Sequence, residues 1–303
     1  MTISAKIICD SISSISNQRI TTFELEYPRF LLCELNTHRK FSRNTASSRA
    51  IPIDVKCEQL LTNGAYPVYW GKNQSGMQAK EEIDEKNKQS ALETWDSAKL
   101  MMIEHAKRLQ SLGVHKQITN RLLEPFETVK TLVTATSFDN FFNLRCHADA
   151  QPEIKALADM MYAEYKKSKP MVIHYGEWHT PYVQRIRDKL NGTIHYYVDG
   201  VEIDKETAIK ISCSCSAQVS YRKNDVSIEK AEKIFDKLVN ARPPHVSPFE
   251  TCATPIDIEK SLQGVTHFDI NDVPYSGNFA NWAQYRHMIP ENTCYNYVPH
   301  EQQ

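Results

Sequence analysis

The sequence predicts an α+β fold in which a mixed or antiparallel sheet is flanked by helices. Segments that alternate apolar and polar residues, such as 20–27, indicate strands of a half-buried sheet. Segments with apolar residues at helical spacing, such as 77–112, indicate helices. These strands and helices alternate without the regularity of βαβ units, which favours the α+β class.

The elements expected in the first part of the chain are strands at 3–9 and 20–27, a short helix after Pro28, an irregular stretch at 51–76, helices at 77–112 and 115–123, a β-rich segment that turns into a helix at 126–145, and a helix from Asp149 to about Lys167. Pro28 stops the strand before it, because proline donates no ladder hydrogen bond. Gly113 stands where a helix C-terminus favours glycine. Asp149 is expected to cap the last helix, with Pro152 in its first turn.

The second part of the chain is expected to hold hairpin turns at 191–192 and 199–200, a strand at 210–221, a helix at about 227–240 and a short helix near 278–288. The hairpin turns are indicated by Asn-Gly and Asp-Gly pairs. The strand at 210–221 is indicated by its alternating small residues.

Composition excludes several classes of protein. The chain has 303 residues, 36 Lys and Arg against 37 Asp and Glu, and a net charge of −1. With 41% hydrophobic and 24% charged residues it is not disordered throughout. No apolar run approaches the roughly 20 residues of a membrane span, and the N-terminus lacks a signal peptide's apolar stretch. Near-neutral charge argues against nucleic-acid binding. We expect a cytoplasmic protein without nucleic-acid or membrane partners.

The eight cysteines are scattered, which indicates free thiols rather than a disulfide framework. Cys213 and Cys215 form the one close pair, and with Cys252 and His245 they leave a zinc hydrolase open as an alternative. The alternation around the pair is read more simply as a strand that carries small thiols on one face, so no metal site is assigned.

The densest polar cluster covers residues 37–49, where cationic side chains and hydroxyls are interleaved and acids are absent. Arginine binds phosphate bidentately, and Ser and Thr hydroxyls complete the shell of an anionic ligand. The cluster therefore indicates a phosphate-binding pocket. A solvated basic loop is the alternative.

A second polar cluster covers residues 140–153, at the start of a predicted helix. Helix N-terminal amides attract anions, which would suit a ligand site. The alternative is a helix start with ordinary capping residues.

Both clusters resemble the motifs of the flavin-dependent thymidylate synthase family. His38-Arg39-x-Phe41-Ser42, with Ser47-x-Arg49, resembles the family signature R-H-R-x-x-S-x-x-x-x-S-x-R. The stretch from Asn140 to Arg145, followed by A-Q-x-E-I at 150–154, is similar to a second family block. Segment 113–125 is similar to the family segment between them.

Two further blocks stand in an unusual order. Residues 217–221 (AQVSY) and 245–250 (HVSPFE) resemble family blocks that ordinarily precede the signature, but here they follow it. The order suggests a circularly permuted, enlarged relative of phage type, since permutation is tolerated where chain termini lie close together. We therefore expect residues 1–170 to hold the signature-bearing core with a helical insertion at about 51–112. Residues 171–303 would hold the permuted remainder and a hairpin insertion, in one compact unit.

The resemblance implies an FAD-dependent methyltransferase. Members of the family are homotetramers with active sites between subunits, and they convert dUMP to dTMP with methylenetetrahydrofolate and NADPH. No protein nucleophile is needed, because the reduced flavin supplies the hydride.

The resemblance also implies roles for individual residues. The flavin contacts of the family match His38, Arg39, Asn143, Arg145, Asp149, Ser220, His245, Ser247 and Glu250. The nucleotide contacts match Thr45, Ser47, Arg49 and Lys155, of which Ser47, Arg49 and Lys155 would serve catalysis.

Four positions depart from the family pattern. Thr37 replaces the first signature Arg, Thr45 replaces an acid or Gln, Asp149 replaces a frequent Asn, and Lys155 replaces an Arg at the pyrimidine. Lysine offers a point charge rather than a planar fork, so recognition of the base can differ. We hypothesise that Gln284 and Arg286 complete the nucleotide site that Thr37 leaves open. A packed helix with solvated tips is the alternative.

Besides the zinc hydrolase, two other functions stay open at this stage. One is a flavin-dependent dUMP or dCMP hydroxymethylase on the same scaffold, which the Lys155 and Asp149 departures favour. The other is a catalytically idle nucleotide-binding homologue.

Overall fold

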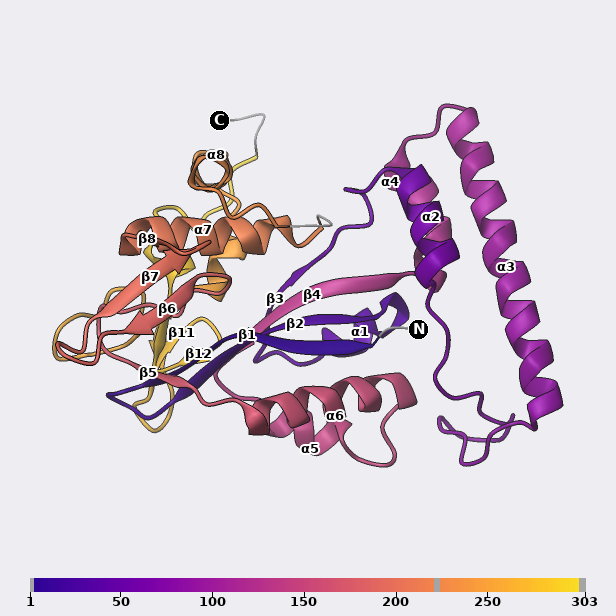
Figure 1. Ribbon diagram of the computed structural model, residues 1–303, viewed down its shortest axis with the longest axis horizontal. Coiled ribbons are helices and arrows are strands. Elements are labelled where there is room, and N and C mark those ends of the chain that lie inside the picture. The colour runs from indigo at the N-terminus through magenta and orange to yellow at the C-terminus, as the bar shows by residue number, and fades with distance from the viewer. Residues whose placement is uncertain (1–2, 221–223, 300–303) are drawn as a thin grey trace.

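The computed structural model describes residues 3–220 and 224–299, and it confirms the α+β fold with a mixed sheet. The central sheet has the strand order β3-β4-β2-β1-β5 (Figure 1). Its strands are β1 (Ser4–Ser13), β2 (Arg19–Pro28), β3 (Ser42–Thr45), β4 (Thr128–Ala135) and β5 (Met171–Ile173). All neighbours are antiparallel except β1 and β5, which are parallel.

The two faces of the central sheet differ in polarity, because successive side chains of a strand point to opposite sides. On one face Phe23, Leu25 and Val133 belong to the largest hydrophobic cluster, which also holds Ile154 and Leu157 of α6. On the other face β2 and β4 carry charged and hydroxyl side chains, including Glu24, Glu26, Thr128 and Lys130. A polar sheet face is available to border a ligand site.

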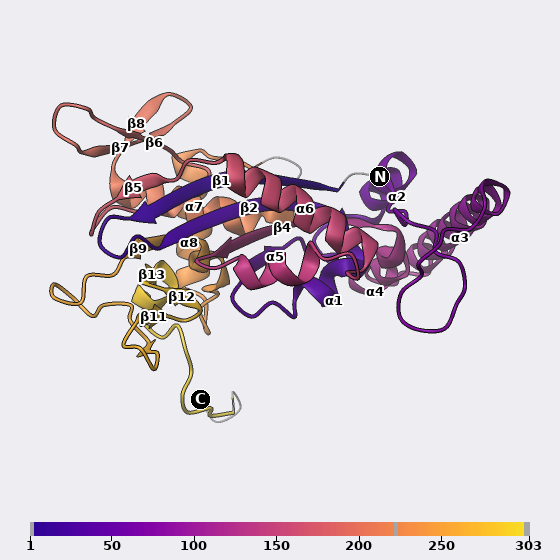
Figure 2. The ribbon, with the colours of Figure 1, turned by 90° about the horizontal axis from the view of Figure 1, so that it is seen from below.

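Helices surround the sheet on three sides (Figures 1 and 2). Helices α5 (Asp139–Arg145) and α6 (Pro152–Lys167) cover the apolar face, and α7 (Lys205–Ala217) and α8 (Ile228–Val239) lie on the other side. At one end are α2 (Ile53–Asn63), α3 (Glu85–Ser111), α4 (Lys116–Thr119) and the 3-10 helix η2 (Asn120–Phe126). None of the helices among the described residues has the length and apolarity of a membrane span.

The C-terminal half adds short strands and 3-10 helices. These are β6 (Gln184–Arg187), β7 (Ile194–Val198), β8 (Val201–Ile203), η3 (Gln218–Ser220), η4 (Ser247–Thr251), β9 (Ala253–Pro255), β10 (His267–Phe268), β11 (Pro274–Ser276), β12 (Phe279–Ala280), β13 (Trp282–Gln284) and η5 (Tyr285–Met288). The predicted hairpin turns at 191–192 and 199–200 connect β6, β7 and β8.

The buried His179 joins this half to the central sheet. Its ring lies 2.8 Å from the hydroxyls of Ser11 and Thr22, on β1 and β2. Its backbone N–H donates to Ala253 O at 2.8 Å. Burial lowers the pKa of His179 well below its usual value, so the ring is neutral in this contact. His179 therefore connects the central sheet with the C-terminal half through buried hydrogen bonds.

The predicted strand at 210–221 is wrong, because residues 205–217 form α7. The side chain of Asp204 accepts a hydrogen bond from Thr207 N at 3.0 Å and caps this helix. The run from Ile211 to Ser216 is buried on every side, so its alternation of small residues carries no information about faces. Helices buried all round lose the amphipathic period that sequence analysis depends on.

Other boundaries also differ from the prediction. The stretch 51–76 contains α2, and the predicted helix near 278–288 is replaced by β12, β13 and the short η5. Gly277 and Asn281 have positive φ values of 57° and 60°, which interrupt helical backbone. Gln151, rather than Asp149, caps α6 by accepting a hydrogen bond from Ile154 N at 3.0 Å.

Candidate active site

The signature segment follows the short helix α1 and continues into β3, the edge strand of the central sheet. The chain passes from η1 (Arg29–Leu31) through α1 (Leu32–Leu35) into a turn at 38–41 and then into β3. Because β3 pairs with β4 alone, its other edge can meet the C-terminal half. His38 is buried in the turn, with its ring 4.8 Å from the ring of Phe141.

His38 and Arg145 are brought together from distant parts of the sequence. Arg145 Nε donates to His38 Nε2 at 3.0 Å, and its Nη1 lies 3.6 Å from Glu34 Oε2. Burial, with the charges of Arg145 and Arg43, lowers the pKa of His38 to about 4. The imidazole is therefore neutral near pH 7, and because Nε2 accepts, its proton lies on Nδ1.

This arrangement predicts a pH dependence of stability. The pKa of His38 is about 4 in the folded chain against a usual value of 6.5, so the unfolded chain binds more protons between these limits. Stability contributed by the neutral ring is complete above about pH 6.5 and falls as the pH drops toward 4. In the variant His38→Gln, the free energy of unfolding measured in urea is expected to fall less steeply over this range. Equal slopes in parent and variant would contradict the assignment.

The signature strand contacts both of the blocks that follow it out of family order. Ser47 N donates to Ser220 Oγ at 2.9 Å, and Asn44 Nδ2 donates to Ser247 O at 3.4 Å. Thr45 Oγ1 accepts from Thr131 at 3.2 Å, inside the sheet. Tyr221, the last residue of the first block, lies outside the described residues. Segments near positions 45, 220 and 247 therefore meet along β3.

The residues proposed to complete the nucleotide site also lie near β3. Gln284 is buried, and its Nε2 donates to Ser42 Oγ at 3.5 Å. Arg286 forms an ion pair and a hydrogen bond with Glu250 of the second block. Thr37 lies on the surface of the neighbouring turn and donates to Glu34 O at 2.7 Å.

Several of the predicted ligand contacts are exposed to solvent. Their side chains are those of Arg39, Arg49, Asn143, His245 and Ser247. Arg43, by contrast, is turned inward and donates to Leu35 O at 3.2 Å and His38 O at 3.1 Å. Among the cations of the signature, Arg43 thus stabilises the turn, whereas Arg39 and Arg49 face solvent.

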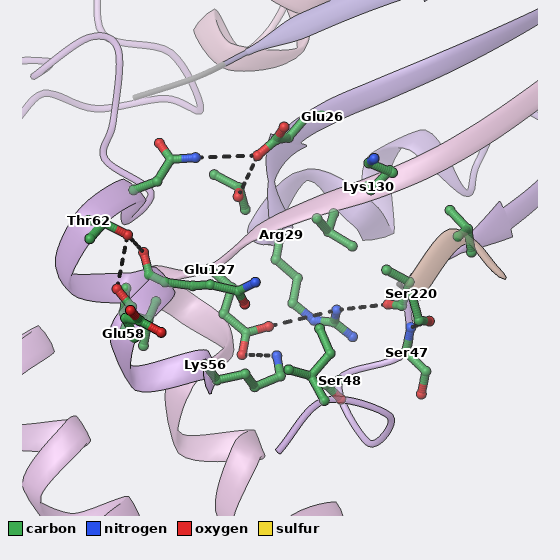
Figure 3. Close-up of a pocket in the computed structure, with 18 residues that line it drawn as sticks. Glu26, Arg29, Ser47, Ser48, Lys56, Glu58, Thr62, Glu127, Lys130 and Ser220 are labelled. Carbon is green, nitrogen blue, oxygen red and sulfur yellow. Dashed lines mark hydrogen bonds and ion pairs between the residues drawn. The ribbon is translucent and has the colours of Figure 1, made fainter. Parts of the chain in front are cut away.

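A cavity of about 440 Å³ borders the end of the signature, just after β3, and the polar face of the sheet (Figure 3). Ser47 and Ser48 line it on one side with Ser220, and Glu26 and Lys130 line it from β2 and β4. Three carboxylates and three cations contribute in all: Glu26, Glu58, Glu127, Arg29, Lys56 and Lys130. The cavity is therefore polar but balanced in charge.

A buried ion cluster forms one wall of this cavity. Lys56 and Glu127 are 4% and 5% exposed and form an ion pair, while Arg29 Nη1 lies 3.9 Å from Glu127 Oε2. Burial lowers the pKa of Lys56 and raises that of Glu127, because each charged form loses hydration. Their mutual attraction opposes both shifts.

Sequence analysis missed Arg29, Lys56 and Glu127, although Lys56 carried a signal. It occupies the second position of an otherwise apolar series on α2, with Ile53, Cys57 and Leu60. A lysine on the buried stripe of a helix requires a partner, and here that partner is Glu127.

Asp149 and Lys155 lie elsewhere, in a second cavity of about 950 Å³. It lies between the start of α6 and the loop 67–80, with Trp95 on its wall. Lys155 Nζ is 2.6 Å from Asp159 Oδ2, so its charge is already paired. Within the described chain these two residues do not line the cavity that Ser47 and Ser220 share.

The cysteines named for a zinc alternative are buried thiols. Cys213 Sγ is 3.5 Å from Cys252 Sγ, and Cys215 is buried nearby on α7. His245 lies on the surface. Residues 3–220 and 224–299 contain no group of three or more His, Cys, Asp or Glu side chains placed to hold a metal ion.

The fold is of the α+β class, and a polar cavity lies beside the signature segment. The model of the family described as thymidylate synthase complementing protein (Thy1) matches residues 3–171, more than half of the chain. The chain belongs to this family. Its match includes the signature segment, α2, α3 and the second polar cluster, and it ends before the two blocks near 220 and 247.

Solved structures with a similar fold include two of the UMP/dUMP methylase PolB from Streptomyces cacaoi. The one bound with 5-Br dUMP has 17% identity and a TM-score of 0.45, over 55% of this chain and 90% of that chain. The one bound with 5-Br UMP has 18% identity and a TM-score of 0.44, over 55% and 89%. No curated protein sequence matches the chain.

Proposed function

We propose that the protein is an FAD-dependent enzyme that methylates carbon 5 of a pyrimidine deoxynucleotide. In this reaction dUMP becomes dTMP, with methylenetetrahydrofolate as carbon donor and NADPH as reductant. One contact supports the proposal above the others: the hydrogen bond of 2.9 Å from Ser47 N to Ser220 Oγ. It joins the signature to a block that stands more than 170 residues further along the chain.

The same contact supports a circular permutation of the family order. Blocks at 217–220 and 245–250 lie beside β3 although they follow it in sequence. A permuted chain keeps its contacts in space and changes only where the chain is cut. Residues 171–303 would then carry the remainder of the core that residues 1–170 begin.

The donors around β3 suit FAD. The residues proposed to hold the cofactor are His38, Arg39, Asn143, Arg145, Ser220, His245, Ser247 and Glu250. When bound, FAD would supply the reducing equivalents for the reaction. The neutral His38 can offer its Nδ1 proton without adding charge.

The nucleotide is proposed to lie where the signature lines the 440 Å³ cavity, at Ser47 and Ser48. Arg49 would bind its phosphate or base, and Ser47 and Thr45 would orient it, with Gln284 and Arg286 at the far end of β3. Since the ion cluster of Lys56 and Glu127 is already neutralised, an anionic group is expected nearer the exposed Arg49.

A flavin-dependent hydroxymethylase acting on dUMP or dCMP is the second candidate. One observation favours it: Lys155, expected at the pyrimidine, forms an ion pair with Asp159 at 2.6 Å and lines a different cavity with Asp149. Recognition of the base would then differ from that of the family. We also propose a homotetramer with shared sites, which light scattering of the purified protein tests.

Product analysis distinguishes these functions. The purified protein is first examined for flavin absorbance and FAD uptake. It is then incubated with dUMP or dCMP and methylenetetrahydrofolate, with and without NADPH, and the products are separated by HPLC. NADPH-dependent dTMP supports the proposal, whereas a hydroxymethylated nucleotide supports the second candidate. Colourless protein that takes up no FAD would contradict both and indicate an idle nucleotide-binding homologue.

A further inference from the structure

The C-terminal hairpin of β11 and β12 reaches the signature turn from the far end of the chain. Its tip is formed by Gly277 and Asn278. Gly277 has a φ of 57°, and a Cβ there would lie 3.0 Å from His287 Nε2. A tight turn with no space for a side chain fixes the direction in which the next residue points.

Asn278 at this tip bonds to both ends of a short stretch of the signature turn. Its Nδ2 donates to Lys40 O at 3.1 Å, and its Oδ1 accepts from Ser42 Oγ at 3.0 Å. The same oxygen accepts from Gln284 Nε2 at 2.7 Å. One side-chain amide therefore connects residues 40, 42 and 284.

The hairpin is held independently of Asn278. Ala280 N donates to Thr136 Oγ1 at 3.1 Å, next to the end of β4. Trp282 is fully buried, and its Nε1 donates to Gln18 O at 3.1 Å. Tyr275 adds a second contact to the turn, with Lys40 Nζ 4.7 Å from its ring centroid. Because these anchors do not use the amide, we expect the hairpin to stay in place when the amide is removed.

We propose that Asn278 is a positioning residue for the active site. This inference rests on the proposed function, in which His38 and Arg39 of the signature turn bind FAD. Asn278 fixes the backbone at 40–42, and this in turn sets the directions of His38 and Arg39 toward the flavin. The hairpin thus contributes to the site through the turn, without touching either ligand.

The test compares Asn278→Ala with Asn278→Asp. The first variant loses all three hydrogen bonds of the amide, while the second keeps the two that its oxygen accepts. We expect Asn278→Ala to weaken FAD binding by about 10-fold, the effect of a lost side-chain hydrogen bond or two, with Asn278→Asp intermediate. The thermal midpoint of Asn278→Ala is expected to fall by a few degrees, because the buried Gln284 and Ser42 lose an acceptor, whereas Asn278→Asp keeps that acceptor. Asn271→Ala, at an exposed position of the same segment, is the control and is expected to bind FAD normally.

Amide hydrogen exchange gives a readout that does not depend on activity. Faster exchange at residues 38–42 in Asn278→Ala, with unchanged exchange in β4, is expected. If the parent takes up FAD and Asn278→Ala binds it equally well, the positioning role is overturned. If the parent takes up no FAD, the proposed function fails, and exchange alone decides: unchanged rates at 38–42 overturn the role of Asn278, and faster rates support it.

Discussion

Glu127→Ala is expected to destabilise the protein by about 3–5 kcal/mol, the usual cost of leaving buried charge without its partner. Lys56 would then be buried without its ion-pair partner, and Arg29 would lose one of its two carboxylates. Chemical denaturation monitored by tryptophan fluorescence measures the free energy of unfolding. A loss below about 1 kcal/mol would show that water reaches Lys56 and replaces the pair.

The double variant Lys56→Met, Glu127→Leu is the matched control. It removes both buried charges and leaves Arg29 with Glu124, whose oxygen is 3.4 Å from its Nη2. Replacing a buried ion pair by apolar residues is often neutral or stabilising, so the double variant is expected to be more stable than Glu127→Ala. If the two variants are equally unstable, the defect lies in packing and the electrostatic explanation is wrong.

Arg49→Ala is expected to weaken nucleotide binding by about 10- to 100-fold, from the loss of charge-assisted hydrogen bonds to an anionic ligand. FAD affinity is expected to change little, since Arg49 is assigned to the nucleotide alone. Arg49 is exposed, so its removal leaves no buried group unpaired and the fold is expected to be unaffected. Titration of dUMP into the flavin-loaded protein, followed by calorimetry, measures the loss.

Two further variants control for charge. Arg49→Lys keeps the charge without the planar fork and is expected to bind with intermediate affinity. Arg108→Ala removes an exposed arginine near the end of α3 and is expected to bind dUMP like the parent. Equal weakening in Arg108→Ala would mean that the effect is one of net charge, and Arg49 would lose its assigned role.

Strongly periodic segments of the fold could be predicted from the sequence, and segments buried on all sides could not. Strands β1 and β2, the long helix α3, α6 and α8 follow their apolar patterns, although α3 begins eight residues after its predicted start and β1 extends four residues past its predicted end. The pattern of α7 predicts a strand instead, because its small residues are buried in every direction and this removes the contrast between its faces. Short β12 and β13 depend on positive φ at Gly277 and Asn281, which the local pattern does not reveal.

The candidate site could be predicted in part, because its motifs are local but its contacts are not. The signature residues were recognisable as a run, and Ser220 and Ser247 as short blocks. Pairing of Arg145 with His38 and of Lys56 with Glu127 depends on how distant elements pack. Asp149 and Lys155 illustrate the limit, since their motif positions match but they line a separate cavity.

The hydrogen bond between Ser47 and Ser220 joins two parts of the candidate site that belong to one chain. This affects how that part of the site responds to dilution. Groups tethered in one polypeptide meet at an effective concentration set by the chain itself, which no change in protein concentration alters. Separating protomers at nanomolar concentration would therefore leave this half-site assembled. A ligand that binds only to the segments around Ser47 and Ser220 would therefore keep its affinity in the monomer.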